Sequence, residues 1–184
     1  MTYLGRRCAV GVALVSMAAC DDPTAVTWVA APDTVLLYSI ASPISNLPNA
    51  FDFIYRTRWL VESADATGSW DVALGSDAEG FMLLPPGALG VSSYAGIWEL
   101  ESASINDLVE APTDTTVYVQ DTAVPLALGN AYVIRTRQLA LSDGSSCAYY
   151  AKAQLVSADL AEKRVRLLFD RNPACYDRGL VPDS

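Results

Sequence analysis

AYVIRTRQLALSDGSSCAYYAKAQLVSADLAEKRVRLLFD, residues 131–170, contains three runs of β-branched, aromatic and aliphatic residues separated by turn-forming residues. The runs cover residues 131–137, 148–157 and 163–170, and their composition is typical of strands. Asp143-Gly144, which lies between the first two runs, is a dipeptide strongly favoured in tight hairpin turns. Two hairpins would join the three strands into an antiparallel meander, so this stretch predicts a β-sheet protein.

The rest of the chain continues the same pattern of short strand-like runs broken by Gly, Pro, Asn and Asp. Further strands are expected at residues 34–40, 50–61, 69–74, 80–84 and 115–120. Residues 75–79 are expected to form a hairpin turn, and Pro85-Pro86-Gly87 is expected to end the 80–84 strand. Residues 104–110 are long enough for one or two helical turns. We therefore predict an all-β fold, an antiparallel sandwich or a barrel-like meander, as one domain over residues 34–184.

Composition narrows the function classes. The chain has 184 residues, of which 52% are hydrophobic, which suits one domain with a real core. The net charge of -9 argues against a nucleic-acid partner, because such proteins carry a basic surface. Histidine is absent from the chain, which excludes Ser-His-Asp and Cys-His catalysis and histidine-ligated zinc or haem. We expect a protein that is not an enzyme and has no metal and no cofactor.

The N-terminus has the pattern of an export signal. Arg6 and Arg7 precede an apolar run over residues 8–19, which is too short to span a bilayer. Met17-Ala18-Ala19-Cys20 resembles the lipobox of bacterial lipoproteins, in which the cysteine sulfur receives a diacylglycerol and the signal is cut off before it. The resemblance implies a signal peptide at residues 1–19, lipidation of Cys20, a tether over residues 20–33, and an extracytoplasmic place in the bacterial cell envelope. It leaves open whether the membrane is the inner or the outer one.

Two alternatives to lipidation fit the same residues. Ordinary secretion would place the cut after Ser16-Met17-Ala18, and an uncleaved segment would serve as an anchor by itself. Removal of residues 1–19 takes away two arginines and no acid, so the charge of the remaining chain would be -11.

The four cysteines divide in a way that agrees with the lipid interpretation. Cys8 would leave with the signal and Cys20 would carry the lipid, so Cys147 and Cys175 remain as an even pair in an oxidising compartment. We expect a disulfide between them. Two free thiols, or half of a metal site, are the alternatives, although no CxxC motif or histidine accompanies them.

Several of the expected strands resemble those of the HmuY-like bacterial surface lipoproteins. Trp70-Asp71-Val72-Ala73-Leu74 is similar to the family's WDhAF stretch, where h is apolar, and Tyr132-Val133-Ile134-Arg135-Thr136 is similar to its YVIKT strand. Tyr150-Ala151-Lys152 resembles its YYK strand, and residues 165–169 resemble its last strand. The order and spacing agree from about residue 69 to residue 170. The resemblance implies an all-β fold at the cell surface.

The haem capture known in that family does not carry over with the fold. Its members hold the iron through pairs of His or Met side chains. This chain has no histidine, and Met82 is the only methionine after Cys20. The resemblance therefore predicts fold and location and assigns no cofactor.

The alternation of side chains along a strand predicts a set of cations on one face of the sheet. Side chains two apart share a face of a strand, so Arg135 and Arg137 are expected to point the same way. Lys152 lies on the next strand of the meander, and Arg164 and Arg166 lie on the one after it. One face carrying these five residues would suit an anionic group such as a phosphate, a carboxylate or an acidic sugar. The alternative is a solvated face neutralised by acids from neighbouring strands and loops.

Six aromatic residues form the other candidate set, which would line a pocket for a flat ligand or fill the core of a sheet: Phe53, Tyr55, Trp59, Trp70, Phe81 and Trp98. In the 50–61 run, alternation places Phe51, Phe53, Tyr55, Trp59 and Val61 on one face. The acidic turn around Asp77 lacks the alternating ligands of a dedicated calcium loop.

These observations favour a membrane-anchored envelope lipoprotein with a non-catalytic β binding module. Its partners would be the membrane, through the lipid, and an anionic small molecule or an envelope protein. A structural or assembly lipoprotein of an envelope complex is the alternative, and a hydrolase comes third. A deep aromatic cavity would favour ligand binding, whereas an open strand edge or a flat apolar patch would favour protein contacts. A hydrolase would need a cleft that holds a carboxylate of strongly shifted pKa.

Overall fold

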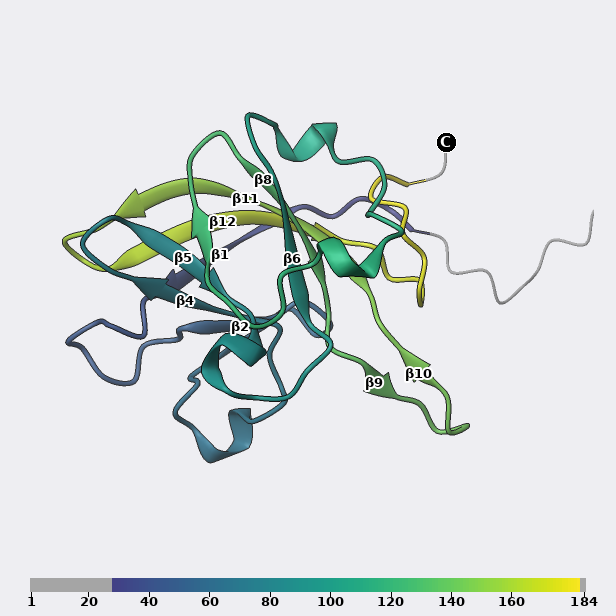
Figure 1. The fold of residues 1–184 in the computed structure, drawn as a ribbon, viewed down its shortest axis with the longest axis horizontal. Helices are drawn as coiled ribbons and strands as arrows, with labels where there is room; N and C mark the ends of the chain where they lie inside the picture. Colours follow the sequence, from purple (N-terminus) through teal and green to yellow (C-terminus); the bar gives the residue numbers. More distant parts are fainter. Residues whose placement is uncertain (1–27, 183–184) are drawn as a thin grey trace, which may run out of the picture.

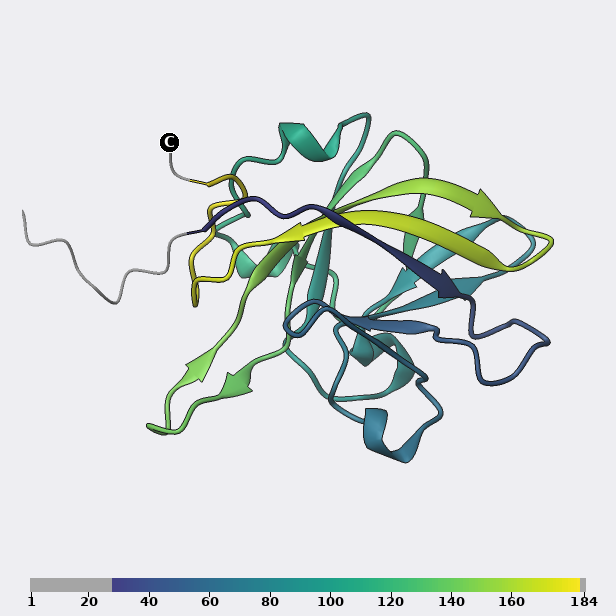
Figure 2. The ribbon, with the colours of Figure 1, turned by 180° about the vertical axis from the view of Figure 1, so that it is seen from behind.

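The computed structural model describes residues 28–182, which form two five-stranded antiparallel sheets stacked face to face (Figures 1 and 2). In the first sheet the strand order is β1-β12-β11-β8-β6. These strands are β1 (Asp33–Tyr38), β12 (Arg164–Arg171), β11 (Tyr150–Asp159), β8 (Ala131–Arg135) and β6 (Gly96–Leu100). Strands β8, β11 and β12 form the meander that residues 131–170 predicted, and the all-β class is confirmed.

The second sheet has shorter strands in the order β3-β2-β4-β5-β7. These are β3 (Thr57–Trp59), β2 (Ala50–Asp52), β4 (Val72–Ser76), β5 (Phe81–Leu84) and β7 (Val124–Leu126). The expected hairpin around residues 75–79 joins β4 to β5. The chain crosses between the two sheets after β1, β5, β6 and β7, so four connections join the two layers of the sandwich.

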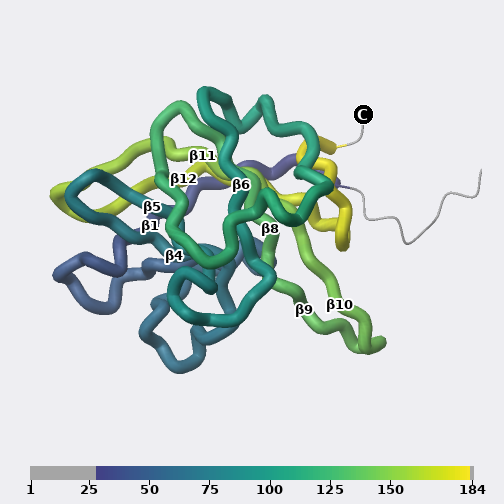
Figure 3. The backbone as a smooth tube through the Cα atoms, viewed as in Figure 1, coloured from purple at the N-terminus to yellow at the C-terminus, as the bar shows by residue number. Residues whose placement is uncertain are grey.

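Short elements complete the described chain. Strands β9 (Leu139–Ala140) and β10 (Ser146–Cys147) form a small hairpin around Asp143-Gly144. This hairpin projects away from the sandwich, as the tube in Figure 3 shows. The helical segments are single 3-10 turns: η1 (Ala64–Ala66), η2 (Pro86–Leu89), η3 (Ile105–Asp107) and η4 (Thr115–Val117). No helix within residues 28–182 is long and apolar enough to cross a membrane.

The main core lies between the two sheets. Phe51 and Phe53 from the second sheet pack edge-on against Phe169 of β12, with ring centroids 4.8 to 5.7 Å apart. Smaller apolar clusters cover the outer faces: Tyr118 and Leu180 pack on the outside of β8 and β11, and Trp70 packs on the outside of the second sheet. Both sheets are thus buried on two sides over part of their area, which explains their near-continuous apolar runs.

The prediction of one strand over residues 50–61 is wrong, because this run folds into the β2–β3 hairpin. A carboxylate oxygen of Asp52 accepts the backbone N–H groups of Ile54 and Tyr55, at 2.8 and 3.2 Å, and so bends the chain into a turn. Arg56 completes the turn with a φ of 54°, in the left-handed region. Tyr55 is consequently exposed at the turn, while Phe53 is buried in the core.

The expected strand over residues 115–120 is also wrong, since its first half is the 3-10 turn η4. The Asp114 side chain accepts the backbone N–H of Thr116 at 2.9 Å and caps that turn. Only Val119 pairs as a strand residue would, through an isolated bridge to Ile97 of β6. Strands β6 and β7 were not predicted from the sequence.

The described chain begins and ends at the same end of the sandwich, where the β9–β10 hairpin also starts (Figures 1 and 2). The tips of the β4–β5 and β11–β12 hairpins lie at the opposite end. The signal peptide expected over residues 1–19 and the expected lipidation site, Cys20, lie outside the described residues.

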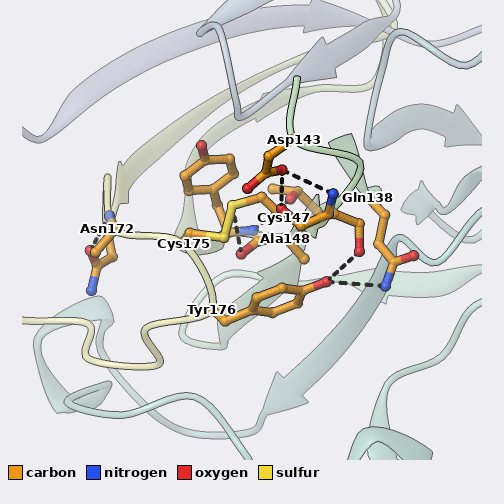
Figure 4. Close-up of a disulfide and its surroundings, with 12 residues drawn as sticks. Gln138, Asp143, Cys147, Ala148, Asn172, Cys175 and Tyr176 are labelled. Atoms are coloured by element: carbon orange, nitrogen blue, oxygen red, sulfur yellow. Dashed lines mark hydrogen bonds between the residues drawn. A yellow bond between two sulfur atoms is a disulfide. The ribbon is translucent and has the colours of Figure 1, made fainter. Parts of the chain in front are cut away.

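A disulfide joins Cys147 of β10 to Cys175 in the C-terminal segment, as expected, with Cα atoms 5.4 Å apart. Next to it the hydroxyl of Tyr176 is hydrogen-bonded to Ser146 at 2.9 Å, and the Gln138 amide donates to the same hydroxyl (Figure 4). The disulfide therefore ties the last segment of the chain to the base of the projecting hairpin.

Replacement of both Cys147 and Cys175 by serine should lower the free energy of unfolding by about 3–4 kcal/mol, because the bond closes a loop of 28 residues. Denaturant unfolding of the variant and the native protein measures the loss. Alkylation of both thiols in the denatured, unreduced native protein would contradict the disulfide.

Candidate functional site

Three charged residues of the described chain, Asp52, Asp71 and Arg137, form an ion cluster in the protein interior. Arg137 follows the end of β8 in the first sheet, whereas Asp52 ends β2 and Asp71 precedes β4 in the second. One guanidinium nitrogen of Arg137, Nη1, lies 2.9 Å from Asp52 and 3.1 Å from Asp71, and the other, Nη2, lies 3.0 Å from Asp52. The cluster therefore joins the two sheets through charged hydrogen bonds.

Both carboxylates of this ion cluster are saturated with donors. Asp71 accepts the backbone N–H of Phe53 at 2.8 Å and that of Arg137 at 2.9 Å, in addition to the guanidinium. Burial raises the pKa of Asp71 to about 6, although the charge of Arg137 acts in the opposite direction. With Asp52 and Asp71 only 1% and 0% exposed, the ion cluster lies within the protein interior and lines no cleft. Its arrangement suits a structural role.

The structure separates the five cations expected on one face. Strand β8 ends at Arg135, so the two-residue alternation stops there, and Arg137 turns toward the second sheet. The expectation that Arg135 and Arg137 point the same way is therefore wrong. Arg135 pairs in register with Tyr150 on the outer face of β8 and β11, beside the apolar cluster that contains Tyr118.

The remaining three cations keep the outer face of the first sheet but have different surroundings. Lys152 is largely buried opposite Asp170, and its burial lowers its pKa. Arg164 pairs with Asp159 at 3.3 Å at the exposed hairpin end. Arg166 is exposed and has no ion-pair partner among residues 28–182. Neutralisation by neighbouring acids thus describes most of the expected cationic face.

Arg166 instead lines a groove that the sequence did not predict. The groove, of about 430 Å³, runs where the edge strand β1 of one sheet approaches the edge strand β3 of the other. It contains two further arginines, Arg56 and Arg58, and the residues that line it are Asp33, Thr34, Val35, Leu36, Phe51, Arg56, Arg58, Arg166 and Phe169. We call it the edge groove.

The three arginines of the edge groove differ in the contacts that they make within the protein. Arg56 donates to a carboxylate oxygen of Asp170 at 3.3 Å and to the carbonyl oxygen of Ala31 at 3.0 Å, with its guanidinium 5.5 Å from the ring centre of Phe169. Arg58 is exposed and, like Arg166, has no ion pair within the described part of the chain. The sequence signal was present as two arginines two residues apart, but their approach to β12 depends on non-local packing.

The aromatic residues considered as pocket walls lie mainly in the packed interior. Phe53, Trp70 and Phe81 are buried, Trp59 and Trp98 pack partly buried against the outer clusters, and Tyr55 is exposed. They do not share one cavity, because they belong to the inner core and to both outer faces. Their distribution fits a packing role.

The Asp77 turn uses its own carboxylate locally. One oxygen of Asp77 accepts the backbone N–H groups of Glu79 and Gly80, at 2.8 and 3.0 Å. Within residues 28–182, no group of three or more acidic or cysteine side chains is placed to hold a metal ion.

Comparison with known proteins gives no match, either to a protein-family model or to a curated protein.

Replacement of Arg137 by methionine should lower the free energy of unfolding by about 3–5 kcal/mol, because it leaves two buried carboxylates without their cation. Arg164→Met is the matched control, since it removes an exposed pair and should cost at most about 1 kcal/mol. Denaturant unfolding measures both. Equal losses in the two variants would contradict a structural role of the ion cluster.

Stability should also depend on pH through Asp71. Its pKa in the folded protein, about 6, lies above the ordinary 3.8, so between these values the folded protein holds the proton more tightly than the unfolded chain. The stabilisation from this proton is complete below pH 3.8 and is lost as the pH rises through 6. The difference in unfolding free energy between the native protein and Asp71→Asn should therefore grow on acidification, by at most about 1 kcal/mol per pH unit.

Asp143→Asn serves as the control for this titration. Hydrogen bonds from Ser145 lower the pKa of Asp143, so its stabilising contribution is present above the ordinary pKa and is lost as the pH falls. A difference for Asp71→Asn that stays constant or shrinks between pH 7 and pH 4 would show that Asp71 titrates normally.

Proposed function

We propose that this protein is a lipid-anchored protein of the bacterial cell envelope whose β domain binds a partner without catalysis. The observation that carries the anchoring is the lipobox-like Met17-Ala18-Ala19-Cys20 that follows the apolar run. The Cys147–Cys175 disulfide supports it, because such bonds persist in oxidising compartments outside the cytoplasm. With these two cysteines paired and Cys8 within the signal, Cys20 is the cysteine left for the lipid.

The anchor would hold the domain close to its membrane in a defined orientation. Only eight residue steps separate Cys20 from Trp28, the first described residue, which limits the reach to about 30 Å. Because the described chain begins at the end of the sandwich that carries the β9–β10 hairpin, that end would face the bilayer (Figure 1). The β4–β5 and β11–β12 hairpin tips at the other end would face away from it.

The binding role is supported by the edge groove rather than by a cavity for a flat ligand. The aromatic side chains do not share one cavity, whereas the edge strand β1 borders a groove lined by arginines. An open strand edge favours contacts with another protein. This observation also supports the alternative role, an accessory in the assembly of an envelope complex, because assembly uses the same kind of contact.

Hydrolysis has less support. The carboxylate with the strongly raised pKa, Asp71, is 0% exposed and hydrogen-bonded to Arg137 and Phe53. A catalytic acid must reach its substrate, and Asp71 lines no cleft that a substrate can enter. The resemblance to the HmuY-like surface lipoproteins agrees with the proposed location, while haem has no ligand pair here, since Met82 has no histidine or second methionine after Cys20 to join it.

The anchor is tested by replacing Cys20 with serine. The native protein, expressed in a bacterium and extracted from its membranes, should carry a diacylglycerol on an N-terminal Cys20 and partition into detergent, whereas Cys20→Ser should do neither. Cys8→Ser is the matched control and should be lipidated like the native protein. Mass spectrometry of the N-terminal peptide decides the question. An unmodified N-terminus beginning at Ala19 would contradict the anchor.

A further inference from the structure

Strand β1 is an edge strand with one free side. It pairs with β12 and has no strand on its other side, as the sheet order and Figure 2 show. The free side is blocked at both of its ends. The N–H of Tyr38 donates to the carbonyl oxygen of Pro48, and near the start of the strand Arg56 donates to the carbonyl oxygen of Ala31. A short open slot remains between these two contacts.

The backbone of β1 inside this slot offers hydrogen bonds. Successive residues of an antiparallel edge strand point their backbone groups alternately toward the partner strand and away from it. The N–H of Tyr38 points away from β12, so that of Leu36 does as well. Among residues 28–182 the Leu36 N–H has no acceptor, whereas the N–H of Thr34 is satisfied by the side chain of Asp33 at 2.7 Å.

The charge beside this slot is positive, although the protein as a whole carries -9. Arg58 and Arg166 stand on strands of different sheets, on either side of the slot, and neither has a carboxylate within ion-pair distance in residues 28–182. Asp33 is the acid that lines the groove, and Asp170 is already bound to Arg56. Two guanidinium groups are therefore available to an incoming anion.

We propose that the edge groove binds an extended acidic segment of a partner protein, which adds to β1 as a further strand. The segment would exchange hydrogen bonds with Leu36 through its backbone and place carboxylates on Arg58 and Arg166. The slot admits three to four residues, because it runs from Asp33 to Leu36 before Pro48 closes it. This inference rests on the proposed binding function and names the class of partner.

A peptide fits the groove better than a free anion does. The two available guanidinium groups stand on opposite sides of a strand edge, and that edge offers donors and acceptors at the spacing of another strand. A free phosphate or a sugar acid would use the arginines and leave the Leu36 N–H without a partner. The backbone therefore distinguishes the two kinds of ligand.

The test uses the full chain in a non-ionic detergent and three fluorescent heptapeptides. The first alternates glutamate and valine, and the second alternates lysine and valine. The third has the glutamates of the first with proline in place of valine, which removes every second backbone donor and fixes φ at about −65°, outside the range of an antiparallel strand. Fluorescence anisotropy at low and at physiological salt measures the affinities. We expect the glutamate–valine peptide to bind at least about tenfold more tightly than either of the others.

Two double variants locate the site. Arg58→Glu with Arg166→Glu should weaken binding of the glutamate–valine peptide by at least about tenfold. Arg164→Glu with Arg178→Glu changes the net charge equally at arginines outside the groove and should leave the affinity within about twofold. Circular dichroism shows whether each variant is folded.

Equal affinity for the glutamate–valine and glutamate–proline peptides would overturn the proposal, as would equal weakening in the two double variants. Displacement of the glutamate–valine peptide by inorganic phosphate or by a galacturonic acid trimer, at equal molar concentration, would also overturn it. The assay involves no membrane, so its failure would leave the Cys20 anchor untouched. An unlipidated Cys20 would likewise leave the peptide result standing.

Discussion

The ion cluster of Asp52, Asp71 and Arg137 is the interaction on which the arrangement of the two sheets depends. A guanidinium from the end of β8 reaches two carboxylates of the opposite sheet, next to a core that is otherwise apolar. Asp52 also accepts the N–H groups that form the β2–β3 turn, so one side chain fixes both a hairpin and the contact between sheets. Because buried charges are stable only when paired, this network allows few other arrangements of these strands.

The same network shows why some strands were predictable and others were not. Strands β1, β4, β5, β8, β11 and β12 follow from local composition and turn residues, and the β4–β5 and β11–β12 hairpins join segments that are neighbours in the chain. The pairing of β1 with β12 is not local and does not follow from composition. The run over residues 50–61 has strand composition throughout, but the hydrogen bonds that the Asp52 carboxylate accepts from Ile54 and Tyr55 bend it. Alternation cannot reveal such a turn, because the side chain competes with the backbone for its donors.

The candidate site was predictable only in part for a related reason. Strand parity placed Arg166 correctly on an accessible face, and it failed for Arg137 because parity holds only as far as the strand continues. Arg56 and Arg58 join Arg166 through the packing of β3 against the edge of the other sheet, more than a hundred residues away in sequence. Contacts of this range depend on the complete fold. Acids already neutralise Arg137 and Arg164, whereas Arg58 and Arg166 have no ion pair within residues 28–182 and line the groove beside β1.

The free edge of β1 is what leaves room for a partner strand, and amide hydrogen exchange followed by NMR shows whether that edge is open in solution. The N–H of Leu37 points toward β12 and should be protected, whereas that of Leu36 points into the slot. In the protein without a partner, Leu36 should exchange at least about a hundredfold faster than Leu37. Equal protection of the two amides would mean that the edge is already covered, and would contradict an open edge on β1.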